Sequence, residues 1–182
     1  HFTIDTPEGV IYHGTDFKLD KNPVDGVVPD YDLLRKVGEK GVLCMLVDCL
    51  RVERSEWSPS ESTTGPAIEE TMRDTQGKFV ITLMSSHIHR IQQTITAAKE
   101  HGRKVVFIGR SVEQNVEIAL ALGKLEIPKE MLIDKRDMDD YSDDKLCVII
   151  AGSQGQEGSS MMRAIFGEHR SVRINPQDKV VF

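Results

Sequence analysis

The chain has 182 residues, 39% hydrophobic and 29% charged, a composition typical of a globular protein that excludes a wholly disordered chain. Its length allows one domain with a sizeable core, or one domain and a fragment of another. The formal net charge of −6 argues against a protein that coats nucleic acid by bulk electrostatics, but it leaves room for a local basic groove.

The sequence carries no signal for secretion or for a membrane. No apolar run approaches the roughly 18 residues of a spanning helix, and no secretory signal opens the chain. The cysteines Cys44, Cys49 and Cys147 form no CxxC pair, and we expect Cys44 and Cys147 to be buried in a reducing compartment. We therefore predict a cytoplasmic protein with no membrane partner. Because the chain starts at His1 and ends on the apolar run Val180–Phe182, we expect a piece of a longer protein.

The first 20 residues differ from the remainder of the chain. Phe2–Asp5 and Val10–His13, separated by a Thr-Pro-Glu-Gly turn, predict a β-hairpin followed by a loop. Proline and glycine punctuate residues 21–30, and we place a domain boundary there. The predicted organisation is a short N-terminal fragment, residues 1–25, and a main domain, residues 26–182.

The main domain alternates short apolar runs with helical patterns. The runs are too short and too evenly apolar for amphipathic helices, so each predicts a strand buried on both faces. The expected strands are Val42–Val47, Phe79–Leu83, Val105–Ile108, Met131–Ile133 and Leu146–Ile150. The expected helices are Tyr31–Lys40, Thr64–Asp74, His87–Glu100 and Ser111–Leu122. This alternation predicts a Rossmann-like α/β fold, with a parallel sheet of about five strands flanked by helices.

The carboxyl ends of parallel strands are where an open α/β sheet binds ligands. Here the strands run into three polar segments, which are Ser85–Arg90, Gly109–Ser111 and Ala151–Gly155. Hydroxyl groups beside helix N-termini suit phosphate, although either Ser86 or Ser111, taken alone, is better explained as a simple N-cap. Five cations against one acid between residues 85 and 110 indicate a basic groove, and they are Arg90, Lys99, Arg103, Lys104 and Arg110.

Other local motifs leave their function open. The glycines at 152, 155 and 158 match neither a dinucleotide fingerprint nor a P-loop. His87 and His89 diverge on a regular helix, so a two-histidine metal site is not expected there. Either histidine could contact a base or a phosphate, or could be buried and hydrogen-bonded.

Several segments together resemble one family. TPEGVIYHGTDFKLD (residues 6–20) is similar to its TPEG…HTGDFKFD, and residues 48–61, with Asp48, Glu53-Arg54 and a final SPSE, are similar to its DSTNAER…TPSE. SHIHRIQQ (residues 86–93) is similar to SNIHRIQQ, and GSQG (residues 152–155) to GSQGEP. Residues 173–182 resemble the segment before the family returns to its catalytic domain. The family is ribonuclease J, a metallo-β-lactamase-fold nuclease with an inserted β-CASP domain.

The resemblance implies a role in RNA recognition. The chain would be the β-CASP domain, with residues 1–25 a fragment of the metallo-β-lactamase domain, of a zinc-dependent 5′-exo- and endoribonuclease. The implied partners are single-stranded RNA with a 5′-monophosphate, the metallo-β-lactamase domain, and a second copy in a homodimeric parent. Asp16 matches the aspartate that bridges two zinc ions. The residues expected at RNA are Asp48, Ser85, Ser86, His87, His89, Arg90, Arg110, Ser111, Ser153 and Gln154.

The sequence departs from the family pattern at several of these points. Gly14-Thr15-Asp16 stands where the family has Thr-Gly-Asp, Cys49-Leu50-Arg51 replaces Ser-Thr-Asn, His87 replaces Asn, and Gln156-Glu157-Gly158 replaces Glu-Pro-Met. The chain contains no HxHxDH motif, no later metal histidine and no SGH segment. Because a binuclear zinc site needs several His and Asp ligands, we expect this chain to be catalytically inactive by itself, although its parent would be a metal-dependent hydrolase.

Two other functions are compatible with the same residues. A stand-alone, flavodoxin-like module could bind a small anionic ligand at the same strand ends, without nucleic acid. The domain could also serve as a protein-interaction or dimer-forming piece, because Val180–Phe182 would expose an apolar surface.

Overall fold

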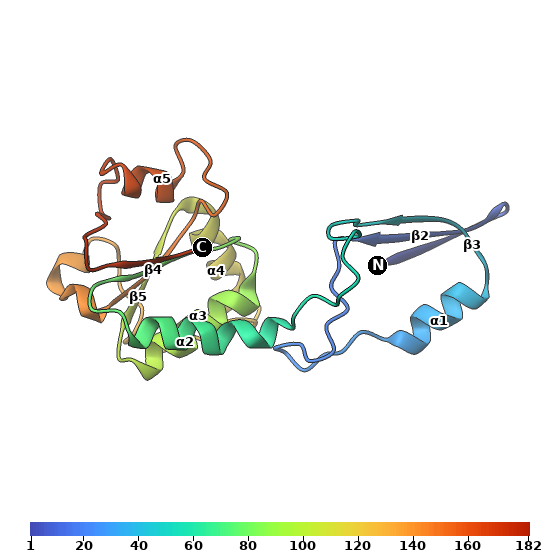
Figure 1. The fold of residues 1–182 in the computed structure, drawn as a ribbon, viewed down its shortest axis with the longest axis horizontal. Helices are drawn as coiled ribbons and strands as arrows, with labels where there is room; N and C mark the ends of the chain where they lie inside the picture. The colour runs from blue at the N-terminus through green and yellow to red at the C-terminus, as the bar shows by residue number, and fades with distance from the viewer. The chain divides into compact units, whose positions relative to one another are not determined.

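The computed structural model describes all 182 residues, which divide into two compact units, residues 1–62 and 63–182 (Figure 1). This division falls later in the chain than the boundary expected at residues 21–30. The assignment of residues 1–25 and 26–182 to two family domains stays a prediction, because compactness alone does not say from which domain a segment comes.

The first unit is a three-stranded sheet with one helix. β1 (Phe2–Thr6) and β2 (Gly9–Thr15) form the predicted antiparallel hairpin. β3 (Val42–Val47) pairs in parallel with β2, so the strand order is β1-β2-β3. α1 (Tyr31–Glu39) lies between them in sequence, and it begins after Asp30, whose carboxylate accepts a hydrogen bond from the Leu33 N–H at 2.8 Å.

This unit has almost no core of its own. Only Val10 and Gly14 are buried within residues 1–62, while Leu43 and Met45 on β3 are 63% and 61% exposed. Val42–Val47 is therefore a strand, as predicted, but not a strand of the main parallel sheet. Its apolar composition indicates pairing and burial, but does not choose the partner strand. Cys44 is consequently exposed, contrary to the expectation, whereas Cys147 is buried as expected.

The second unit contains a four-stranded, all-parallel sheet flanked by helices. Its strands are β4 (Phe79–Thr82), β5 (Lys104–Ile108), β6 (Leu146–Ile150) and β7 (Lys179–Val181), in the order β5-β6-β4-β7. Its helices are α2 (Thr64–Arg73), α3 (Ile88–Glu100), α4 (Arg110–Ala121) and α5 (Ser160–Ile165). Short 3-10 turns occur at Glu61–Thr63, Met138–Asp140 and Asp143–Lys145. The predicted fold class is confirmed.

Alternate residues of each strand face two separate apolar clusters. Phe79 and Ile81 pack with α2, α3 and α4, while Val80 between them packs with Met161 of α5 on the other face. In Figure 1, α2 and α3 lie on one side of β4 and β5, and α5 lies on the opposite side. Because both faces are covered, the strands are apolar throughout, which is the pattern that made them visible in the sequence.

The structure differs from the expected sheet in two strands. Met131–Ile133 contributes only a single bridge, between Leu132 and Val105, so it is not a full strand. The fourth strand is instead β7, which pairs with β4 at the other edge. Val180 and Val181 therefore pack against the two clusters, and of the expected apolar surface only Phe182, 75% exposed, stays uncovered. No helix of the structure is long and apolar enough to cross a membrane.

Candidate functional site

The carboxyl ends of β4, β5 and β6 lead into one small pocket of about 250 Å³. Because the three strands are parallel neighbours, the loops that follow them meet at the same edge of the sheet. The polar side chains that line the pocket are Ser85, Ser86, Ser111, Ser153, Gln154 and Gln156. Five of these six were expected from the sequence to contact RNA.

Neither Ser86 nor Ser111 caps the helix beside it. α3 begins after His87, whose ring Nδ1 accepts a hydrogen bond from the Arg90 N–H at 3.3 Å, and α4 begins after Gly109. The capping function proposed as the simple explanation of these serines is therefore performed by other residues. Both hydroxyls line the pocket, where they can donate hydrogen bonds to an anion.

Two glycines make this close approach of loops feasible. Gly109 and Gly152 have φ angles of 113° and 121°, which L-residues with side chains rarely adopt. A Cβ at Gly152 would lie 2.5 Å from Ser159 Oγ, and one at Gly109 would lie 2.7 Å from the Cβ of Ala151. On the other side of the pocket, Asn115 Nδ2 of α4 donates to Ser85 Oγ at 3.1 Å and fixes the loop after β4.

The remaining residues expected after β4 do not line the pocket. His87 is the N-cap of α3, and His89 and Arg90 lie in the first turn of that helix. His87 is half-buried, and its Nδ1 accepts the Arg90 N–H. Capping of α3 is therefore enough to explain why a histidine stands at this position. The RNA contacts predicted for these three residues stay untested predictions.

The basic groove predicted between residues 85 and 110 does not form as a single surface. Arg103 is 4% exposed and lies by the amino end of β5, where its guanidinium donates to the carbonyls of Thr75, Gly77 and Leu146. Lys104, at the start of β5, donates to the Glu130 carbonyl at 2.7 Å. Arg110 follows the carboxyl end of the same strand, so the length of β5 separates these cations. Arg103 and Lys104 therefore do not belong to such a groove, whereas the RNA contacts of Arg90 and Arg110 stay predictions.

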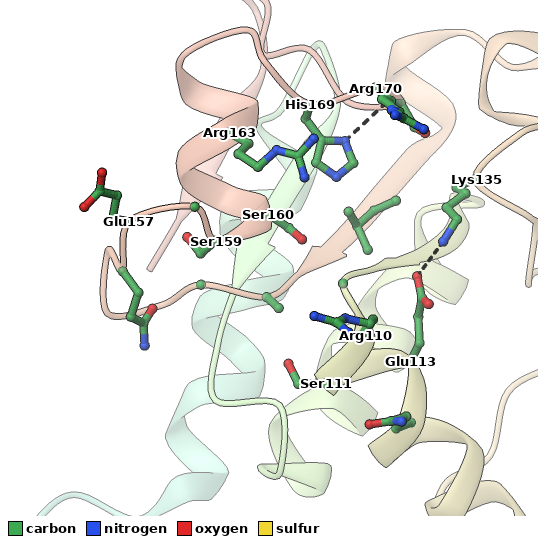
Figure 2. Close-up of a pocket in the computed structure, with 18 residues that line it drawn as sticks. Arg110, Ser111, Glu113, Lys135, Glu157, Ser159, Ser160, Arg163, His169 and Arg170 are labelled. Atoms are coloured by element: carbon green, nitrogen blue, oxygen red, sulfur yellow. Dashed lines mark hydrogen bonds and ion pairs between the residues drawn. The ribbon is translucent and has the colours of Figure 1, made fainter.

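A larger cleft, of about 950 Å³, adjoins the small pocket (Figure 2). The two hollows share four lining residues, Ser111, Ala151, Gly152 and Gln156. Arg110 lines this cleft rather than the small pocket. The sequence analysis missed the other basic residues of the cleft, which are Lys135, Arg163, His169 and Arg170. These four residues are far apart in sequence. The only sequence feature that pointed to them is that Arg163, His169 and Arg170 all follow the last predicted strand.

The ring of His169 is held in one orientation within the cleft. Its Nδ1 accepts hydrogen bonds from the N–H groups of Ser171 and Val172, both at 3.2 Å. Burial, and then the positive charges of Arg163 and Lys135, hold the pKa of His169 below its ordinary value. The neutral ring therefore carries its proton on Nε2, and Figure 2 shows this second nitrogen directed into the cleft beside Arg163.

Asp16 and Asp48 lie in the first unit, at the ends of neighbouring strands. Asp16 follows β2 and Asp48 follows β3, where Thr15 pairs with Val47. Asp48 Oδ1 accepts the Leu50 N–H at 2.9 Å, and Asp16 is exposed. Thr15 has a φ of 53°, in the left-handed region that a β-branched residue rarely adopts. This strained residue stands at the position where the ribonuclease J motif has glycine.

The chain does not provide a metal site. No group of three or more His, Cys, Asp or Glu side chains is placed to hold a metal ion. Two carboxylates at neighbouring strand ends are too few for the four ligands that zinc takes, and fewer still for two ions. The residues present therefore do not fit a binuclear zinc centre within this chain.

The four-stranded parallel sheet with helices on both faces defines a Rossmann-like α/β domain, in which the loops after three strands converge at one edge. Comparison with known proteins identifies the family. The family profile described as "Ribonuclease J, beta-CASP domain" matches residues 76–182, so the chain belongs to the ribonuclease J β-CASP family.

Curated relatives match nearly the whole chain. Ribonuclease J of Helicobacter pylori (strain ATCC 700392 / 26695) is 38% identical over 178 residues, which are 98% of this chain and 26% of that protein. Ribonuclease J of Thermus thermophilus is also 38% identical, over 98% of this chain and 31% of its own length. The Synechocystis (strain PCC 6803) protein is 34% identical over 98% of this chain and 28% of its own. The chain thus spans between a quarter and a third of the relatives' length.

Proposed function

We propose that this chain is the RNA-recognition part of a ribonuclease J-type, zinc-dependent 5′-exo- and endoribonuclease. The observation that carries the proposal is the small pocket, where three strand ends place hydroxyl and amide groups around one point. Ser85, Ser86 and Ser111 would donate hydrogen bonds to the terminal phosphate of a single-stranded RNA. Ser153 and Gln154 would contact the sugar or base of the same nucleotide.

Residues beside the pocket would complete the contacts with RNA. His89 and Arg90 on α3, and Arg110 on α4, lie in the first turns of helices that start at the same sheet edge. His87 would act mainly by capping α3, and Asp48 by orienting the loop that follows β3. These assignments rest on the family motifs and on the position of each residue after a strand.

Binding of a short RNA tests this function. We expect the chain to bind a 5′-monophosphorylated dinucleotide more tightly than the same RNA with a 5′-hydroxyl, because the phosphate carries the charge that the pocket binds. Removal of one charged hydrogen bond in Ser86→Ala should weaken binding about tenfold, a change of roughly 1.4 kcal/mol. Isothermal titration at two salt concentrations measures both effects.

The control is Ser142→Ala, which makes the same chemical change near the amino end of β6 and outside the pocket. Its affinity should equal that of the unchanged chain. Equal affinity for the two RNA ends, with no effect of Ser86→Ala, would contradict a terminal-phosphate pocket. Tight binding of small anions without any RNA binding would favour the flavodoxin-like module.

Catalysis would require metal ligands from outside these residues. In the ribonuclease J parent we propose two zinc ions that activate a water molecule, with Asp16 as one ligand. We expect no zinc-dependent RNA cleavage by the 182-residue chain, because it lacks the remaining ligands. A gel assay with 5′-labelled RNA and added zinc checks this. Cleavage that disappears in Asp16→Ala would show that the chain assembles a working centre.

The metallo-β-lactamase domain is the proposed intramolecular partner. The exposed apolar side chains of β3, such as Leu43 and Met45, support an extensive protein contact for the first unit. A cytoplasmic location and a homodimeric parent belong to the same proposal. The alternative of a dimer built on Val180–Phe182 has less support, because only Phe182 lacks cover there.

A further inference from the structure

A methionine, Met84, lies in the wall of the small pocket. Its side chain is 59% exposed, although Leu83 directly before it is 5% exposed and belongs to the core. The other lining side chains are hydroxyls, amides, an alanine and a buried leucine, none of which reacts with a mild oxidant. The Met84 thioether is therefore the one group in the pocket that oxidation can change, from an apolar group to a polar one.

The methionines of the chain differ sharply in their access to solvent. Met45 and Met84 are exposed to almost the same extent, 61% and 59%. The remaining five are buried or partly buried, and they are Met72, Met131, Met138, Met161 and Met162. An oxidant in solution therefore reaches Met45 and Met84 first. Met45 lies on β3 of the first unit, so only Met84 combines this exposure with a place in the small pocket.

The backbone around Met84 is fixed on both sides. The Met84 carbonyl accepts the His87 N–H at 2.8 Å, which closes a turn before α3. The neighbouring Ser85 Oγ accepts a hydrogen bond from Asn115 Nδ2 of α4 at 3.1 Å. A shift of this loop would break both hydrogen bonds, so an oxygen atom added to the Met84 sulfur stays at the wall of the pocket.

The modification is a two-electron oxidation by hydrogen peroxide. A lone pair of the Met84 sulfur attacks one peroxide oxygen, and the O–O bond breaks. The departing hydroxide takes the proton of the transferred oxygen and leaves as water, so sulfur is oxidised to the sulfoxide and peroxide is reduced. Methionine sulfoxide reductases reverse the step with two thiols, which become a disulfide while the oxygen leaves as water.

The sulfoxide opposes binding of an anion in this pocket. Its oxygen carries a partial negative charge and accepts hydrogen bonds, whereas the thioether sulfur is only a weak acceptor. The Ser86 and Ser111 hydroxyls would then have a competing acceptor beside them, and a phosphate would approach an oxygen of like charge.

We propose that Met84 is a reversible oxidation site, at which hydrogen peroxide lowers the affinity of the small pocket for the 5′-phosphate of RNA. The inference rests on the proposed function, because it takes that phosphate as the ligand. It adds a modification site and a way to regulate the pocket, and it assigns this regulation to a side chain that is not itself a hydrogen-bond donor to phosphate.

The test measures RNA binding before and after treatment of the 182-residue chain with dilute hydrogen peroxide. Dithiothreitol is then added to reverse disulfides and sulfenic acids at the exposed Cys44 and Cys49, since it leaves methionine sulfoxide in place. Peptide mass spectrometry should find Met84 and Met45 oxidised at similar rates and ahead of the buried methionines. The oxidised chain should bind the 5′-phosphorylated dinucleotide about tenfold more weakly, the effect of losing one charged hydrogen bond. The 5′-hydroxyl dinucleotide should lose less, and the two sulfoxide reductases, one for each epimer, should restore the affinity.

The matched variants are Met84→Leu and Met45→Leu, each compared with its own untreated form so that any effect of leucine itself cancels. Met84→Leu should lose the sensitivity to peroxide, whereas Met45→Leu should keep the full loss. An equal loss in Met84→Leu overturns the inference, because oxidation would then act from another residue.

Two further outcomes separate this inference from the proposed function. If mass spectrometry shows Met84 oxidised and the affinity is unchanged, or if Met84 stays reduced while Met45 is oxidised, the switch is overturned and the RNA pocket stands. If the untreated chain does not prefer the phosphorylated dinucleotide, the proposed function fails, and the switch fails with it.

Discussion

Replacing Arg103 with methionine should lower the free energy of unfolding by about 3 to 5 kcal/mol. The Arg103 side chain is 4% exposed, and its guanidinium donates to the carbonyl oxygens of Gly77 at 2.9 Å, Leu146 at 3.1 Å and Thr75 at 2.7 Å. Methionine fills similar volume but donates nothing, so three acceptors lose their partner. Each buried acceptor without a partner costs about 1 to 3 kcal/mol. Urea unfolding followed by circular dichroism measures the change.

Arg73→Met is the matched control for this substitution. The Arg73 side chain is 57% exposed on α2 and pairs only with Glu69, so its loss should change stability by less than about 0.5 kcal/mol. The comparison also addresses function. If Arg103→Met lowers the free energy of unfolding by less than about 1 kcal/mol, the guanidinium is not needed in the core. Arg103 would then again be a candidate for the basic RNA-binding groove predicted from the sequence.

Replacing Lys78 with methionine should cost a similar amount, about 3 to 5 kcal/mol, because it leaves a buried carboxylate without its cation. Lys78 Nζ lies 3.1 Å from Asp178 Oδ2 and 2.9 Å from Asp143 Oδ2, and the Asp178 side chain is 0% exposed. Asp178 also accepts the Lys78 N–H at 2.7 Å and the Asn175 N–H at 2.8 Å, so it joins the start of β4 to the turn before β7. Thermal and urea unfolding at pH 7 measure the loss.

The control for Lys78 is Asp143→Asn. The Asp143 side chain is 43% exposed, so water replaces its interactions and the loss should stay near or below 1 kcal/mol. The double variant Lys78→Met/Asp178→Asn, which removes the buried carboxylate charge together with its cation, should recover part of the deficit of Lys78→Met. A double variant as unstable as Lys78→Met would mean that poorer packing, and not the stranded charge, causes the destabilisation.

The strands and helices of the second unit could be predicted from the sequence because each is marked locally. Strands buried on both faces must be apolar throughout, so β4, β5 and β6 stand out between polar segments. Helices α2 and α3 were likewise found within a residue of their ends. The order of the family motifs along the chain identified the family without any structure. Parallel topology then predicted that the residues after each strand share one edge, and the small pocket confirms that placement.

Contacts between distant segments were decided by the tertiary structure alone. β3 has the composition of a core strand, but its partner is β2, and no local pattern records that choice. Arg103 and Arg110 are seven positions apart in the sequence, yet a whole strand separates a buried structural arginine from an exposed one. The larger cleft brings together Arg110, Lys135 and Arg170, which come from three segments far apart in the sequence. Local sequence determines which segments form strands and helices, but long-range packing determines which charges become neighbours.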